Sequence, residues 1–313
     1  MHLITRLILL IILFPLFSIG QTEPMSSLYN YNGLMINPAY AGSHDLLTVN
    51  VMHRKQWMGV NGTPSFQLVS AHAPLSKESL SIGAIASTDK HGVTRNSKGA
   101  VGLAYRIFLG EKRGSESRYI SFGLQAGAVL MSSRFSEVIT ADINDPAFSY
   151  DVASKIAPDF AAGLYYKTPK FTAGISVPSI IQKEFSQDLT AIKLSLNPNN
   201  LSLLTYAHYY VPMNGAWIFK PSTMIRWNTY GSNAVDLNAS FIYQNRMSAG
   251  LSYRAGSALV MMIEAKATAQ FKLSYGYDFA IGTTSQYSRG SHEVGLQYEF
   301  GHKISSFNPR DPF

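Results

Sequence analysis

The sequence predicts an all-β protein: a transmembrane antiparallel β-barrel of about 14 strands, of the bacterial outer-membrane type. Charged residues make up only 14% of the 313 residues, whereas a soluble domain usually carries about a quarter. The chain is nonetheless rich in aromatic residues, with 18 Tyr and 17 Phe. An α-helical membrane protein would contain further runs of about twenty apolar residues, and no such run follows residue 20. Low charge, many aromatics and short apolar segments together favour a barrel.

The segment 291–300 shows the strand pattern most clearly. From Glu293 to Phe300, polar residues and glycine alternate with apolar or aromatic residues. A period of two with aromatics on the apolar face suits a sheet that has lipid on one side and water on the other. The spacing of Gly295, Tyr298 and Phe300 also resembles the C-terminal assembly signal of outer-membrane barrels, although Val294 stands where a polar residue is usual.

Similar alternation recurs along the chain and predicts the other strands. The expected strands are 45–54, 66–73, 79–88, 98–109, 117–131, 157–167, 170–177, 201–211, 216–228, 233–245, 247–256, 258–267, 270–279 and 291–300. Their number is even, as in bacterial single-chain barrels.

The predicted connections differ in length between the two ends of the barrel. Connections after odd-numbered strands include the long stretches 55–65, 89–97, 132–156, 178–200 and 280–290. Those after even-numbered strands are mostly a few residues long, and two short odd ones, near Gly231 and Gly256, are exceptions. Barrels of this class have short periplasmic turns and longer extracellular loops. The asymmetry therefore predicts that the first strand begins and the last strand ends on the periplasmic side.

The sequence divides into four expected parts. Residues 1–20 read as a secretory signal, with an apolar run after Arg6 and cleavage expected between Gly20 and Gln21. Residues 21–44 are not strand-like and are expected in the periplasm, on the rim or as a plug in the lumen. Residues 45–300 form the barrel, and 301–313 are a C-terminal tail.

Several charged residues interrupt the alternation on the face predicted to point inward. They are Arg106, Arg226, Arg254, Lys272 and Asp278, and Arg54 has the same parity in the first strand. An arginine facing lipid near the midplane costs about 2–4 kcal/mol, so inward placement is favoured. These charges indicate either a salt-bridged interior that closes the lumen or a pathway for solutes, and the first is the simpler interpretation.

The most distinctive short segment is 36–43, Ile-Asn-Pro-Ala-Tyr-Ala-Gly-Ser. Asn37-Pro38 at one end and Gly42 at the other set turn geometry, with Ala39 and Tyr40 between them. The segment is expected either to pack as a lead-in to the first strand or to act as a plug or partner-docking element, together with Trp57.

These residues also carry a resemblance to a known family. The segment 37–43, the run 54–57 ending in Trp57, then Pro64, 70–75 and the closing 290–293 occur in an order similar to that of the PorP/SprF family. The resemblance implies an outer-membrane barrel of the type IX secretion and gliding apparatus of Bacteroidota. It also implies other components of that system as partners, and a large secreted adhesin with a C-terminal sorting domain as cargo.

The residue types argue against most other functions. The chain has no Cys, which excludes disulfides, thiolate catalysis and Cys-based metal sites. No His-Glu-x-x-His or Gly-x-Ser-x-Gly motif occurs, so we expect no catalytic residue, metal or cofactor. The net charge of +7 is spread along the chain, which favours anionic outer-membrane lipid over nucleic acid as a partner. The main alternative to an assembly role is an outer-membrane channel for hydrophobic small molecules.

Overall fold

The computed structural model describes residues 26–60, 62–75, 79–110, 117–137, 151–185, 191–197, 201–228, 233–286 and 288–301. The expected signal peptide and its cleavage point at Gly20 and Gln21 lie outside these residues, as does nearly all of the expected tail.

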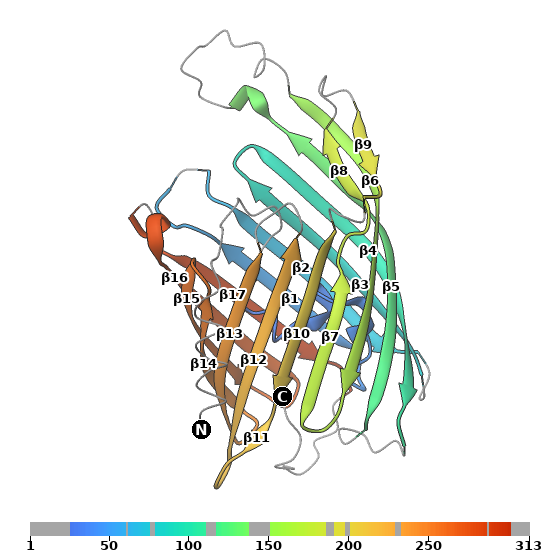
Figure 1. The fold of residues 1–313 in the computed structure, drawn as a ribbon, viewed down its shortest axis with the longest axis vertical. Helices are drawn as coiled ribbons and strands as arrows, with labels where there is room; N and C mark the ends of the chain where they lie inside the picture. The colour runs from blue at the N-terminus through green and yellow to red at the C-terminus, as the bar shows by residue number, and fades with distance from the viewer. Residues whose placement is uncertain are drawn as a thin grey trace.

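The described residues form a closed antiparallel barrel of fourteen strands (Figure 1). The strands are β1 (Thr48–Lys55), β2 (Ser65–Pro74), β3 (Leu80–His91), β4 (Thr94–Phe108), β5 (Tyr119–Ser133), β6 (Val152–Lys167), β7 (Phe171–Val177), β10 (Ser202–Tyr209), β12 (Trp217–Asn228), β13 (Ala234–Tyr243), β14 (Met247–Arg254), β15 (Ala258–Lys266), β16 (Phe271–Ala280) and β17 (Ser291–Glu299). Sequential neighbours pair throughout, and the pairing of β1 with β17 closes the cylinder. The predicted fold class and strand number are confirmed.

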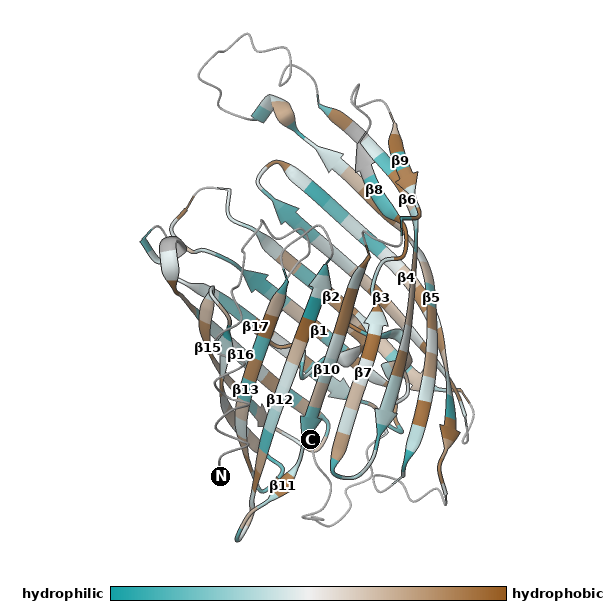
Figure 2. Cartoon of the chain, in the orientation of Figure 1, coloured by the Kyte–Doolittle hydropathy of each residue, from teal (hydrophilic) through white to brown (hydrophobic). Residues whose placement is uncertain are grey.

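Burial along the strands follows the period of two. On β17 the carboxylate of Glu293 is fully buried, whereas Val294 and Leu296 are exposed to the outside. Figure 2 shows the same alternation of hydrophilic and hydrophobic residues along the other strands. The arrangement is the reverse of a soluble domain, because large apolar side chains cover the outer face and polar ones face inward. Such a surface requires hydrocarbon around it.

The two ends of the barrel carry different connections. We call the end with connections 56–64, 134–151, 178–201 and 281–290 the outer end, and the opposite end the inner end. At the inner end the turns 168–170, 244–246 and 267–270 are short, although the connection 109–118 is not. The two longest connections, 134–151 and 178–201, are both at the outer end, which is typical of the extracellular side of such barrels.

One predicted connection is wrong. The stretch 89–97 was expected to be a long loop, but β3 runs to His91 and β4 starts at Thr94. The two strands pair down to His91 opposite Thr94, and Gly92 has a φ of +57°, which glycine adopts without steric cost. The polar residues of this stretch are therefore strand residues that extend the wall at the outer end.

The outer end carries structure that the alternation did not predict. Within 178–200, β8 (Gln182–Phe185) and β9 (Ile192–Ser195) form a separate two-stranded sheet, at the top of Figure 1. A two-residue strand, β11 (Val211–Pro212), also pairs with β12 at the inner end. Short 3₁₀ turns, η4 (Phe135–Glu137) and η7 (Gly282–Gln286), lie in outer connections.

Residues 26–47, which we call the plug segment, precede β1, and residues 26–44 are buried or half-buried inside the barrel. The plug segment contains two 3₁₀ helices, η1 (Gly33–Met35) and η2 (Pro38–Tyr40), and η2 packs against β4, β5 and β6. Leu28 of the plug segment joins a buried cluster with inward-facing Met52, Leu68 and Val260. Among the described residues, no helix is long and apolar enough to cross a membrane.

Candidate functional site: a plug held in the barrel lumen

The plug segment is fitted to the barrel wall most tightly at Asn37. Its side chain is 0% exposed, its Oδ1 accepts a hydrogen bond from the Ala39 N–H at 2.9 Å, and its Nδ2 donates to the Leu164 carbonyl oxygen at 2.8 Å. Gly123 on β5 and Gly163 on β6 lie opposite each other in register and face this turn. A Cβ on Gly163 would lie 2.1 Å from Asn37 Oδ1, and one on Gly123 would lie 2.1 Å from the Ala39 nitrogen. The glycine pair therefore makes the space that the turn occupies.

Pro38 and Asn37 also determine the local shape of the turn. Asn37 is the N-cap of η2 and has an extended backbone, as the residue before a proline prefers. Pro38 is the first helical residue, where its restricted φ is favourable and its missing N–H costs nothing. The Asn-Pro-Ala sequence thus forms this turn locally and presents the Asn37 amide to the wall.

Tyr40 and Gly42 make a second contact, with the wall near the inner end. The Tyr40 ring packs edge-on against His72 and Tyr165, with centroids 5.5 and 5.6 Å away. Gly42 has a φ of +73°; its N–H donates to His72 Nδ1 at 3.3 Å, and its carbonyl oxygen accepts from Arg106 Nη1 at 2.8 Å. The strand side chains therefore bind the plug backbone directly.

His44 continues this contact toward the end of β17. Its Nε2 lies 3.1 Å from the Tyr40 hydroxyl, and its Nδ1 lies 3.0 Å from the Glu299 carboxylate. Burial lowers the pKa of the His44 imidazole below its ordinary value, although the neighbouring Glu299 carboxylate acts in the opposite direction.

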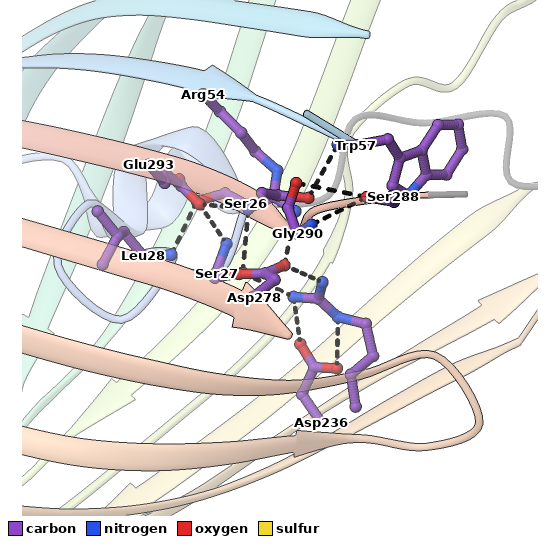
Figure 3. A network of polar contacts seen from close by, with 12 residues as sticks. Ser26, Ser27, Leu28, Arg54, Trp57, Asp236, Asp278, Ser288, Gly290 and Glu293 are labelled. Carbon is purple, nitrogen blue, oxygen red and sulfur yellow. Dashed lines mark hydrogen bonds and ion pairs between the residues drawn. The ribbon is translucent and has the colours of Figure 1, made fainter. Parts of the chain in front are cut away.

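The other end of the plug segment is held by a buried polar network centred on Ser27 (Figure 3). The Ser27 hydroxyl donates to Asp278 at 2.7 Å and accepts from Arg54 and Arg254, each at 3.1 Å. The Ser27 backbone N–H donates to Glu293 at 2.7 Å. One residue of the plug segment thus connects four barrel strands, β1, β14, β16 and β17.

Ion pairs between strands complete the network. Arg54 contacts Asp278 at 2.7 Å and Glu293 at 2.9 Å, while Arg254 contacts Asp236 and Asp278, both at 3.1 Å. All five side chains are buried. Removing one partner of such a buried set costs about 3–5 kcal/mol, because it leaves the other charges uncompensated. The network therefore couples the seating of the plug to the closure of the barrel.

The predicted lumen charges do not form one site. Arg54, Arg254 and Asp278 meet in the network at Ser27, whereas Arg106 lies at Gly42, with its guanidinium 5.6 Å from the Tyr119 ring centroid. Lys272 lies 4.0 Å from the Glu299 carboxylate that His44 also contacts, and Arg226 lines a cavity near the outer end.

Sequence reasoning did not include Glu293 and Asp236 among the functional residues. Both were visible as acidic residues on the polar face of a predicted strand. Only the strand register shows that they lie next to Arg54 and Arg254.

Trp57 lies away from the plug segment. It follows β1 at the outer end, has a φ of +49° and is 42% exposed, and its backbone N–H donates to Ser291 Oγ at 3.2 Å. The residues proposed as an assembly signal lie on β17 or directly after it: Tyr298 and Phe300 face outward, and Gly295 packs against Ser274.

The plug separates two cavities. The outer chamber has a volume of about 480 Å³ and is lined by Tyr29, Met35 and Ile36 of the plug. The inner chamber has a volume of about 250 Å³ and is lined by Tyr31, Tyr40 and other plug residues. The two sets of described lining residues have no member in common. Among the described residues, the plug segment therefore lies between two separate cavities.

A comparison with protein families identifies the chain. The model for type IX secretion system membrane proteins PorP/SprF matches residues 18–298. The chain belongs to the PorP/SprF family. This PorP/SprF protein is therefore a membrane protein of the type IX secretion system, and other components of that system are its partners. Family membership and the closed barrel place it in the bacterial outer membrane.

One solved structure supports the fold of this PorP/SprF protein, and two others are more distantly similar. The CymD monoaromatic hydrocarbon channel matches with 14% identity and a TM-score of 0.52, over 91% of this chain and 95% of that one. Omp33 of Acinetobacter baumannii matches with 8% identity and a TM-score of 0.44, over 82% and 99%. A FadL homologue of Pseudomonas aeruginosa matches with 11% identity and a TM-score of 0.41, over 90% and 96%. At 14% identity, the similarity to CymD concerns the fold alone. A comparison with curated proteins gives no match.

Proposed function

We propose that this PorP/SprF protein is a non-enzymatic docking component of the type IX secretion and gliding apparatus. It assists the export and surface retention of a large adhesin-like cargo that carries a C-terminal sorting domain. The family match carries this proposal. The plug supports it, because within the described residues it fills the lumen between two cavities and leaves a surface for binding at each end.

The outer end offers the surfaces suited to cargo. The β8–β9 hairpin is held above the barrel by Lys183, which contacts the Asp159 carboxylate of β6 at 2.5 Å. Connections positioned by a rigid scaffold are where binding residues concentrate in proteins. Trp57, exposed at the same end, provides an aromatic contact of the kind that is enriched in protein interfaces.

The experiment is a chromosomal deletion in the source bacterium, followed by quantification of surface proteins. We expect one large secreted adhesin to be lost from the surface and recovered on complementation with the wild-type gene. A complementing variant that lacks residues 182–195 tests the outer end: we expect it to assemble but fail to retain the cargo. Unchanged surface proteins in the deletion strain would contradict the proposal.

The alternative function, a channel for hydrophobic small molecules, requires the plug to leave the lumen. Asn37, Gly42 and Ser27 each contact the wall through hydrogen bonds that would have to break. Ligand uptake by intact cells that depends on this gene, with no change in surface proteins, would favour the channel instead.

A further inference from the structure

The outer chamber has a composition unusual for the lumen of an outer-membrane barrel, which is generally polar. Its wall includes the inward-facing apolar side chains of Phe66, Leu68, Ile85, Leu204 and Met224. Beneath them, Met35 and Ile36 of the plug segment form an apolar floor. The volume of the chamber, about 480 Å³, lies within the usual range of small-molecule sites, about 300–1,000 Å³.

Polar groups line one part of the same chamber. The charged side chains among its described lining residues are Lys98, Lys183, Arg226 and Asp159, so the basic groups outnumber the acidic one. Lys98 and Lys183 both contact the single Asp159 carboxylate, at 2.6 and 2.5 Å. One carboxylate cannot neutralise both ammonium groups, so among the described residues this pair of lysines is only partly balanced by negative charge.

Lys98 is the group best placed to contact a ligand. Lys183 donates to Asp159, to Ser179 Oγ and to the Ile181 carbonyl oxygen, which accounts for its three N–H groups. Described residues accept two hydrogen bonds from Lys98, at Asp159 and at the Pro178 carbonyl oxygen, and its side chain is 21% exposed. A third donor of Lys98 is therefore available.

We propose that the outer chamber binds a small amphiphile with an anionic head group, such as a medium-chain carboxylate. The head group contacts Lys98, and the apolar body lies on Leu68, Ile85 and Met224 above the plug. An apolar pocket with a few converging polar groups is the arrangement typical of such sites. The site differs from the proposed cargo surface, because its ligand is bound inside the barrel, where Gln182 and Lys183 of β8 contribute to the chamber wall.

The test uses the intact protein in amphipol, with equilibrium dialysis of radiolabelled decanoate and of the uncharged 1-decanol, and with protein-free amphipol subtracted. We expect saturable binding of decanoate at one site, with affinity for 1-decanol lower by about tenfold or more, since the alcohol cannot form the ionic contact. Equal affinities for the acid and the alcohol would overturn the assignment of Lys98 as the residue that contacts the head group. No saturable binding of either would overturn the site.

Variants locate the binding. Lys98→Met should reduce decanoate affinity about tenfold and leave 1-decanol unchanged, while Lys90→Met, which removes an exposed lysine that does not line the chamber, should change neither. Met224→Trp fills the chamber and should abolish binding of both ligands. Heat-dependent gel migration, which reports barrel folding, is measured for each variant. Undiminished binding in folded Met224→Trp would refute the proposal.

A peptide identifies the class of ligand. A short apolar peptide with a free carboxyl terminus has the same chemistry as decanoate, and its amidated form is the control. We expect the peptide to bind more weakly than decanoate, because the chamber encloses little more than one small molecule. Tighter, carboxylate-dependent binding of the peptide would overturn the assignment to a small amphiphile.

Discussion

Gly163→Ala should unseat the plug without changing the chemistry of the lumen. The added methyl group would lie 2.1 Å from Asn37 Oδ1 and 2.9 Å from its Cγ, and the backbone carbonyl oxygen of Ile175 is 3.2 Å away on the other side. The new atom cannot move because it is attached to a paired strand, so Asn37 must give way. Asn37 would then lose its hydrogen bonds to Ala39 and Leu164.

The cost follows from these contacts. Overpacking a close contact costs about 1–3 kcal/mol. A shift of about 2 kcal/mol changes the ratio of seated to unseated plug roughly 30-fold. The outward face of the strand is not changed by the substitution. Most of this free-energy cost should therefore weaken the seating of the plug and not the stability of the barrel.

Conductance in planar lipid bilayers measures the seating directly. Wild-type protein should be closed almost all the time, and Gly163→Ala should show openings more frequent by about one order of magnitude. Gly99→Ala is the matched control, because nothing lies within 4 Å of a Cβ at that strand glycine. If Gly163→Ala is as closed as wild type while folding normally, the fit between Asn37 and the glycine pair does not hold the plug.

Three further predictions concern the wall and the outer end. Arg254→Leu removes the partner of Asp236 and one partner of Asp278, so the free energy of unfolding in detergent should decrease by about 3–5 kcal/mol. An unchanged melting temperature would show that the network does not stabilise the barrel. Leu251→Lys places a charge on the lipid-facing side of β14 and should weaken folding into lipid vesicles by about 2–4 kcal/mol, whereas Leu251→Met should have little effect; equal folding of both would argue against lipid at this face. Asp159→Asn removes the charge that Lys98 and Lys183 share, which should weaken the attachment of the β8–β9 hairpin by about 1.5–3 kcal/mol; limited proteolysis within 182–195 should speed up, and an unchanged cleavage rate would refute this role.

The alternation of residues determined the fold class of this protein and the number of its strands. That inference needs only local information, because the side of a strand on which a residue lies depends on whether its position is odd or even. The same parity indicated that Arg54, Arg254 and Asp278 point inward. It could not exclude strand structure for polar residues at the rim, where both faces meet water, and so the stretch 89–97 was wrongly expected to be a loop.

The contacts that hold the plug were decided only by the tertiary structure. Gly123 and Gly163 are unremarkable strand glycines in the sequence, and only register places them together opposite Asn37. Ser27 likewise meets Asp278 and Glu293, more than 250 positions away in the chain, because the barrel closes with β17 beside β1. Parity tells which way a side chain points, but which side chains meet inside the lumen depends on strand register and closure, and these are properties of the whole cylinder.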